Sequence, residues 1–190
     1  YSGESYRPQL ILNNHKLGQK VLTSLETELN NCDEFFISVA FITMSGIIPL
    51  LQTLQELEAD GVKGKIITTD YLSFSEPAAL EKLNSFRNIE LKFYCAGDRG
   101  FHTKGYIFRR GEEYRIIVGS ANLTSNALTR NEEWNTKLVS MEQGEYTEGI
   151  IRRFHELWQD EHTLPYAEIA DKYKGYYTAQ KSWQQYTNLA

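Results

Sequence analysis

The sequence predicts an α/β fold with a mixed, largely parallel central sheet and helices on both faces of that sheet. Strand-like apolar runs alternate with segments of helical periodicity through the first half of the chain, which is typical of parallel strands joined by helices. A hydrophobic content of 41% and a charged content of 24% in 190 residues match an ordinary globular protein. No run of eighteen apolar residues occurs, so we expect no membrane-spanning helix and no membrane partner.

The first half of the chain supplies the alternating elements. Leucine and valine residues recur at helical spacing over about residues 16–31, which predicts an amphipathic helix. Residues 34–41 form a mostly apolar run rich in strand formers, as a buried strand does. The elements expected next are a helix that begins at Ser45 and ends at Gly61, a strand at 65–69, a helix from Pro77 to Phe86 and a strand at 89–94.

The pattern changes in the second half of the chain. Residues 104–108 and 114–118 are strand-like, and the charged segment between them predicts a hairpin turn. A last strand is expected at 133–139 and an amphipathic helix at 144–158. The polar, tyrosine-rich segment 164–190 is interpreted as a C-terminal extension or linker with room for one helix. The expected organisation is therefore a domain at 1–163 followed by this extension.

The charges are unevenly distributed along the chain. The formal net charge of −5 excludes a histone-like protein that coats nucleic acid through bulk charge. Residues 97–130 nevertheless carry six basic and three acidic side chains. This cluster fits either one anion-binding face or charges that protect strand edges from aggregation. The candidate substrate-binding residues of the first interpretation are Arg99, Arg109, Arg110, Arg115 and Arg130.

The two cysteines indicate the compartment. Cys32 and Cys95 lie far apart in the sequence and form neither a CxxC pair nor a disulfide framework. This usage is typical of a reducing compartment, so we expect a cytoplasmic location. The chain begins with Tyr1 and no signal peptide follows, and we expect it to be a piece of a longer protein.

Two short segments contain the side chains that are best suited to binding a ligand or to catalysis. Residues 101–108 read Phe-His-Thr-Lys-Gly-Tyr-Ile-Phe, and residues 118–123 read Val-Gly-Ser-Ala-Asn-Leu. Alternation on a strand places His102 and Lys104 on one face, and likewise Ser120 and Asn122. An ammonium, an amide and a hydroxyl can hold a phosphate, while an imidazole can attack phosphorus or move a proton. The bland alternative is a structural histidine together with a Gly-Ser-x-Asn turn that caps a helix.

In spacing, these residues resemble the His-x-Lys and Gly-Ser-x-Asn motifs of the phospholipase D-like superfamily. The resemblance covers roughly residues 5–160 and is closest to the single-motif nucleases. The segments 38–41, 68–71, 101–106 and 118–124 also resemble the phospholipase D-like domain at the N-terminus of bacterial DEAD/DEAH-box helicases. The sequence departs from the superfamily motif at Arg109, because the motif has an aspartate five residues after the lysine.

The resemblance implies a phospholipase D-like fold and a role for each motif residue. His102 is expected to form a covalent phosphohistidine. Lys104 and Asn122 are expected to hold phosphoryl oxygens, and Ser120 to add a hydrogen bond near them. Glu133 is expected to be the glutamate that orients a histidine, with Glu132 as the alternative one residue away.

The function expected from these residues is that of a metal-independent nuclease, a phosphodiesterase domain that acts on nucleic acid, DNA in particular, within a larger helicase. The alternative is a non-catalytic phosphate- or DNA-binding module of a helicase; a lipid phosphodiesterase ranks third. No metal site or cofactor is expected in this domain, because it has no P-loop and no histidine at metal-ligand spacing; ATP and magnesium belong to a linked helicase region. The tryptophans Trp134, Trp158 and Trp183 are expected to be core or interface residues rather than a base-stacking platform.

A single motif also predicts a homodimer. The reaction needs one histidine to attack phosphorus and a second to protonate the leaving oxygen, but the chain has one His-x-Lys motif. A second copy can supply the other histidine across a two-fold axis, so that the active site is shared.

Overall fold

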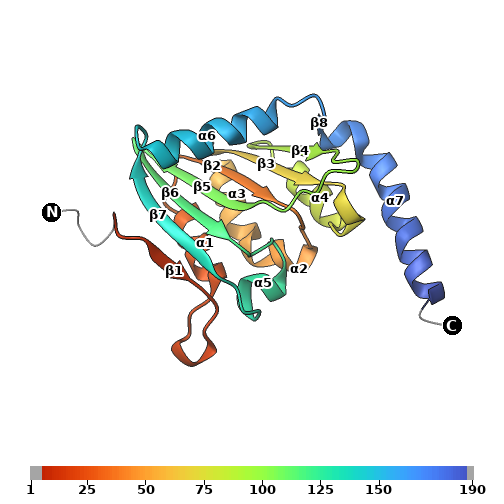
Figure 1. The fold of residues 1–190 in the computed structure, drawn as a ribbon, viewed down its shortest axis with the longest axis horizontal. Coiled ribbons are helices and arrows are strands. Elements are labelled where there is room, and N and C mark those ends of the chain that lie inside the picture. The colour runs from red at the N-terminus through yellow and green to blue at the C-terminus, as the bar shows by residue number, and fades with distance from the viewer. Residues whose placement is uncertain (1–5, 188–190) are drawn as a thin grey trace.

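The computed structural model describes residues 6–187 and contains one eight-stranded sheet covered by helices (Figure 1). The strand order is β1-β7-β6-β5-β2-β3-β4-β8. The strands are β1 (Gln9–Ile11), β2 (Glu34–Val39), β3 (Lys63–Thr69), β4 (Ile89–Tyr94), β5 (Lys104–Arg110), β6 (Glu113–Gly119), β7 (Asn135–Met141) and β8 (Thr163–Pro165).

The α-helices are α1 (Val21–Leu29), α2 (Met44–Ile47), α3 (Leu51–Ala59), α4 (Pro77–Asn84), α5 (Ser125–Thr129), α6 (Glu145–Trp158) and α7 (Tyr166–Thr187). Three short 3₁₀ turns, η2 (His15–Leu17), η3 (Ile48–Leu50) and η4 (Tyr71–Ser73), complete the described elements. No described helix is long and apolar enough to cross a membrane.

The α/β class is confirmed, but the expectation of a largely parallel sheet was wrong. Only β2–β3 and β3–β4 pair in parallel, through the crossover helices that the sequence predicts. The other pairings between described strands are antiparallel. The physical reason is that the loop from β4 to β5 (residues 95–103) is too short for a crossover, so β5 starts at the end of the sheet where β4 stops and runs antiparallel to β2. The tight turn at Gly111 then makes β6 antiparallel to β5.

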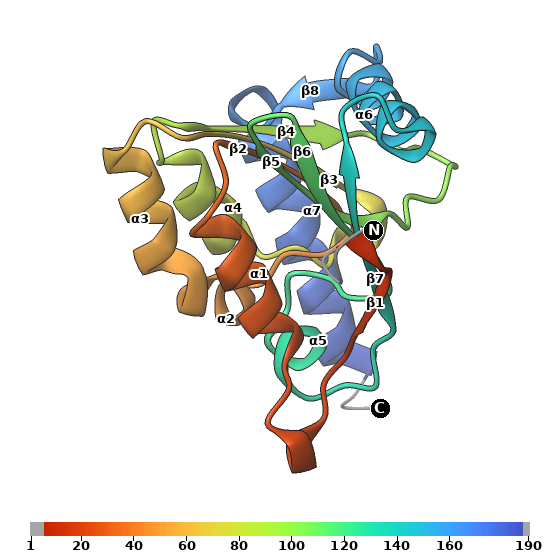
Figure 2. The ribbon, with the colours of Figure 1, turned by 90° about the vertical axis from the view of Figure 1, so that its left-hand side faces the viewer.

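The helices lie on both faces of the sheet, but unequally. Figure 2 shows α1 to α5 and α7 on one side of the sheet and α6 alone on the other. The larger core lies on the first side, where Phe35, Tyr106 and Phe108 from the strands pack against the helices. On the second side, Phe154 and Trp158 of α6 pack against the strands.

The segment after residue 163 belongs to the same core. β8 pairs with β4 at the edge of the sheet, and the expected domain boundary falls inside this strand. Tyr166 and Tyr173 of α7 are buried against Phe93, at ring-centroid distances of 5.5 and 4.9 Å. The extension therefore completes the larger core.

Candidate active site

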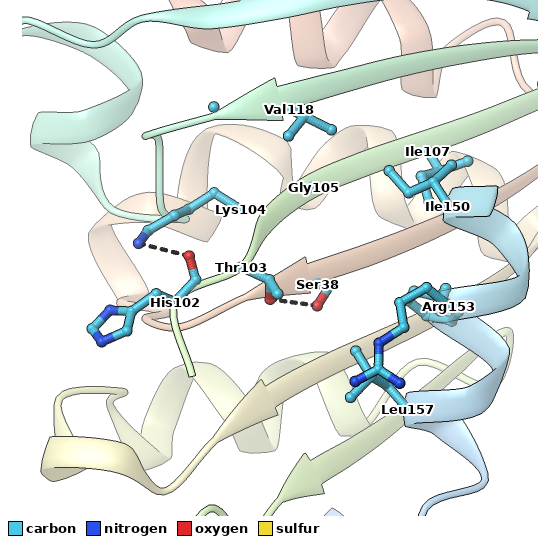
Figure 3. A pocket seen from close by; sticks show the side chains of 12 residues that line it. Ser38, His102, Thr103, Lys104, Gly105, Ile107, Val118, Ile150, Arg153 and Leu157 are labelled. Atoms are coloured by element: carbon cyan, nitrogen blue, oxygen red, sulfur yellow. Dashed lines mark hydrogen bonds between the residues drawn. The ribbon is translucent and has the colours of Figure 1, made fainter. Parts of the chain in front are cut away.

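His102 and Lys104 lie where the chain enters β5. Lys104 is the first residue of β5, and His102 stands two residues earlier, in the loop from β4. His102 is exposed, and the edge of its ring meets Tyr71 at a centroid distance of 5.2 Å. The Lys104 ammonium donates a hydrogen bond to the His102 carbonyl oxygen at 3.0 Å. Figure 3 shows the imidazole and the ammonium projecting from the same end of the strand, away from α6.

Asn122 and Ser120 reach the same edge of the sheet from the loop that follows β6. Asn122 Oδ1 accepts a hydrogen bond of 3.1 Å from the backbone N–H of Phe41, which follows β2. Since Lys104 pairs with Val39 of β2, the ends of β2, β5 and β6 meet at this edge. The Asn122 carbonyl oxygen is thereby occupied, and its NH₂ group is the part that can donate to a phosphate.

A buried asparagine that the sequence analysis did not select fixes this loop. Asn135 Oδ1 accepts from the backbone N–H groups of Ser120 and Ala121 at 3.1 and 3.2 Å. The Tyr106 hydroxyl donates to the Ala121 carbonyl at 2.8 Å, and burial, together with the negative charge of Glu133, raises the pKa of Tyr106. Three polar contacts therefore hold the backbone between Ser120 and Asn122.

Glu133, and not Glu132, is directed to the motif. The buried Glu133 carboxylate accepts a hydrogen bond from the Ser120 hydroxyl, whereas Glu132 accepts from the exposed Trp134 indole at 2.9 Å. The Ser120 hydroxyl also accepts from the Trp134 backbone N–H at 3.1 Å. The Ser120 hydroxyl therefore donates its proton to Glu133. Through this hydrogen bond, Ser120 connects Glu133 to the loop that follows β6.

A cavity of about 260 Å³ opens beside His102, between the sheet and α6. His102 and Lys104 line it, but Ser120 and Asn122 do not. The sequence analysis expected strand alternation to continue through Ser120 and Asn122, whereas β6 ends at Gly119 and the chain then turns. The other lining residues, most of which Figure 3 labels, are Ser38, Thr103, Gly105, Ile107, Val118, Gly119, Ile150, Arg153, Phe154 and Leu157.

Two of the five candidate arginines lie in segments next to the motif. Arg99 is in the loop that leads to His102, and Arg130 caps α5, three residues before Glu133. Arg109 and Arg110 stand at the opposite end of β5, and Arg115 lies on the α1 side of β6. Arg109 and Arg110 are therefore about 20 Å from the motif, the length of a seven-residue strand. Arg115 is directed toward Glu28 of α1 and not toward the motif.

The ion pairs of Arg109 and Arg115 explain their positions. Arg109 contacts Glu34 at 3.2 Å and Asp33 at 3.8 Å. Arg115 contacts Glu113 at 2.8 Å and the buried Glu28 at 3.7 Å. Position 109 lies at the far end of β5. Arg109 in place of the superfamily aspartate therefore removes no group from the end of the sheet that holds His102, Lys104 and Asn122.

The structure also shows the surroundings of the possible metal ligands and of the tryptophans. Within residues 6–187, no three His, Cys, Asp or Glu side chains are grouped so that they could hold a metal ion. Trp158 is buried as expected, but Trp134 and Trp183 are 70% and 73% exposed and are not core residues. Tyr71, Asn135 and Arg153 are the site residues that the sequence analysis missed. Tyr71 and Arg153 come from segments far from the motif in sequence, and Asn135 stands two residues after Glu133 at a position that no motif spacing marks.

Comparisons with known proteins agree with this arrangement. Residues 25–158 match the family described as "Cardiolipin synthase, PLD-like domain". A search of curated proteins found no match.

Three solved structures share the fold. NucT from Helicobacter pylori superposes with a TM-score of 0.65 at 16% identity, over 84% of this chain and 98% of that chain. Nuc from Salmonella typhimurium, a phospholipase D family member, gives 0.63 at 17% identity, over 84% and 99%. Phosphatidylserine synthase from Haemophilus influenzae gives 0.62 at 15% identity, over 95% of this chain and 45% of that chain.

The superposed structures and the family match agree on the fold of this chain. The superpositions establish the fold, and the motif residues meet at one edge of it. Because the family match spans well over half of the sequence, the chain belongs to the PLD-like domain family.

Proposed function

We propose that the domain is a metal-independent phosphodiesterase that cleaves nucleic acid through a phosphohistidine intermediate. The observation that carries the proposal is the exposed His102 imidazole beside the Lys104 ammonium, at the sheet edge that also holds Asn122. A nucleophile, a cation and an amide donor are the groups that an attack on a phosphodiester requires.

The proposed reaction has two steps. A nitrogen of His102 attacks phosphorus and forms a P–N bond, while the P–O bond to the leaving group breaks and the leaving oxygen takes a proton from a general acid. Water then attacks the phosphohistidine, which restores the imidazole and releases the phosphate ester. Lys104 and the Asn122 NH₂ group stabilise the charge on the phosphoryl oxygens in both steps.

A second histidine is the natural general acid. His102 is exposed at an open edge, so a second copy of the chain can bring its own His102 to the same phosphate. We propose a homodimer with this shared site. Nucleic acid as the substrate rests on the resemblance to the single-motif nucleases and on Arg99, Arg130 and Arg153, whose positive charges flank the motif loops and the cavity.

The wider context is part of the proposal. On the strength of the sequence resemblance, we propose that the domain is part of a larger DNA-processing helicase, with ATP and magnesium used only by the linked motor. The alternative function, a phosphate-binding module without catalysis, uses the same edge and predicts binding without turnover.

The test is cleavage of a fluorescent oligonucleotide and of bis(p-nitrophenyl) phosphate in the presence of EDTA. We expect the protein to hydrolyse both, and His102→Ala to lose about a thousandfold of the rate or more, since the nucleophile is removed. The matched control is His15→Ala, because His15 is an exposed histidine in η2, outside the motif. We expect it to retain full activity.

The same assay separates the alternatives. Oligonucleotide binding that His102→Ala preserves, with no turnover by the wild type, would favour the binding module. Activity that EDTA abolishes and magnesium restores would contradict the proposed mechanism.

A further inference from the structure

The proposed phosphodiesterase reaction assigns no role to the cavity beside His102. We propose that it is a subsite for one unpaired nucleobase of the substrate whose phosphate lies at His102. This inference rests on the proposed function and deepens it, because it names nucleic acid with an unpaired base beside the cleaved phosphate as the substrate class.

The walls of the cavity are apolar on two opposite sides. Ile107 and Val118 of the sheet form one side, and Ile150, Phe154 and Leu157 of α6 form the other (Figure 3). A volume of about 260 Å³ accommodates one planar base with its sugar, whereas a two-chain lipid is far larger. Apolar walls with a few polar groups at the rim are typical of sites for small organic groups.

A glycine opens the cavity toward Lys104. Gly105 follows Lys104 in β5 and lies in register between Ser38 of β2 and Val118 of β6. All three line the cavity, and the missing side chain leaves a depression in the middle of the row. A base can therefore enter the cavity while its phosphate stays beside His102 and Lys104.

Polar groups in the cavity lining can form hydrogen bonds with the edge of a base. The hydroxyls of Ser38 and Thr103 share a hydrogen bond of 2.6 Å, and each is both a donor and an acceptor. Arg153 lines the same cavity from α6 and contacts Glu156 at 3.1 Å. A paired and stacked base of a duplex cannot reach such a site, so the nucleotide must be single-stranded or extruded.

The first experiment measures binding and does not depend on catalysis. The probes, titrated by calorimetry, are thymidine 5′-monophosphate and 1,2-dideoxyribose 5-phosphate, in which a hydrogen atom replaces the base. We expect wild type to bind the nucleotide about tenfold more tightly, because the apolar contact with the base adds to the phosphate contact. We expect Gly105→Val to bind both probes equally, since its side chain fills the depression.

The variant is chosen so that the fold survives. A Cβ at Gly105 meets nothing closer than Val118 Cγ2 at 4.0 Å, and valine favours strands. Ile150→Trp fills the cavity from α6 and provides a second test. Gly149→Val is the matched control, because Gly149 lies on α6 outside the cavity and a Cβ there meets no atom within 4 Å. It should keep the tenfold preference.

The second experiment measures cleavage of a single-stranded oligonucleotide with one cleavable phosphodiester. Its partner substrate carries an abasic tetrahydrofuran in place of the adjacent nucleoside. We expect wild type to prefer the normal substrate about tenfold in kcat/KM, and Gly105→Val to cleave both at the rate of the abasic substrate.

Each outcome decides a different claim. If wild type binds the two probes equally, or if Gly105→Val keeps the preference, the nucleobase subsite is wrong whether or not the domain is a nuclease. If the preference exists but His102→Ala cleaves as fast as wild type, the subsite stands and the proposed mechanism fails. If a short-chain phospholipid binds through Gly105 and the nucleotide does not, the cavity is a lipid site and the inference is overturned.

Discussion

Asn135 shows how one buried amide can determine the geometry of a site that it does not enter. It begins β7, is 2% exposed, and accepts from two consecutive N–H groups of the Ser120–Asn122 loop. Its NH₂ group donates to the Ile11 carbonyl at 3.2 Å, which ties the edge strand β1 to the same point. Since buried donors without an acceptor are costly, this residue keeps the loop in one conformation.

We expect Asn135→Ala to lower the free energy of unfolding by about 1–3 kcal/mol, because the buried Ala121 N–H loses its acceptor and the Ser120 N–H keeps only its 3.2 Å bond to the Trp134 carbonyl. The activity should fall as well, since Asn122 is no longer held beside Lys104. Urea unfolding and the oligonucleotide assay measure the two effects. Asn126→Ala, on the exposed side of α5, is the matched control and should change the stability by less than about 0.5 kcal/mol. Equal effects of the two substitutions would contradict the role of Asn135.

At the scale of elements, α7 is stabilised by tyrosines that carry their hydroxyls into the core. The Tyr173 hydroxyl donates to the Ser75 carbonyl at 2.6 Å. The Tyr166 hydroxyl is buried and has no hydrogen-bond partner among the described residues. Burial raises the pKa of both, that of Tyr166 to about 12.

This burial predicts a loss of stability in alkali. Between pH 10 and pH 12 the unfolded chain releases the Tyr166 proton and the folded protein keeps it, so the free energy of unfolding falls as pH rises through this window. Tyr166→Phe should reduce this fall, and at pH 7 it should leave the stability unchanged or raise it by about 1 kcal/mol. Denaturant unfolding at pH 7 and pH 11 tests both effects. Tyr176→Phe, on an exposed part of α7, should alter neither; a Tyr166→Phe protein as sensitive to alkali as wild type would contradict this account.

The elements also show what the sequence could predict. The apolar runs of β2, β3 and β4 and the helices between them were predicted because each signal lies within a few residues. The edge strands β1 and β8 have three residues each, too few for a periodicity. The face of α7 that packs on the core combines Tyr166 and Tyr173 with Ile169 and Ala170, and in a polar, tyrosine-rich segment this face gives a weak apolar signal. Sheet direction was mispredicted because the pairing of β5 with β2 joins segments about 70 residues apart.

The same limit applies to the site. His102 and Lys104 were placed together correctly because they are two residues apart at the entrance to one strand. Arg109 and Arg115 were placed wrongly, because adjacency in sequence says nothing about which end or face of a strand a charge occupies. Tyr71 reaches His102 only through the tertiary fold.

At the scale of the whole molecule, the proposed homodimer has a quantitative consequence. If both copies of His102 serve one phosphate, a dimer with one His102→Ala subunit is inactive. An equal mixture of refolded wild-type and variant chains should then retain roughly one quarter of the wild-type activity, because random pairing leaves that share of intact dimers. Retention of one half, together with a monomer in sedimentation, would show that each chain acts alone.

The proposed mechanism requires that His102 forms a covalent bond to phosphorus. Rapid mixing with a single-stranded oligonucleotide in EDTA, alkaline quenching to preserve the P–N bond, and mass spectrometry of the peptide that contains His102 test it directly. We expect a nucleotidyl adduct on His102 that appears before product accumulates and is absent from His102→Ala. Cleavage by wild type without this adduct, or an adduct on a different residue, would contradict it.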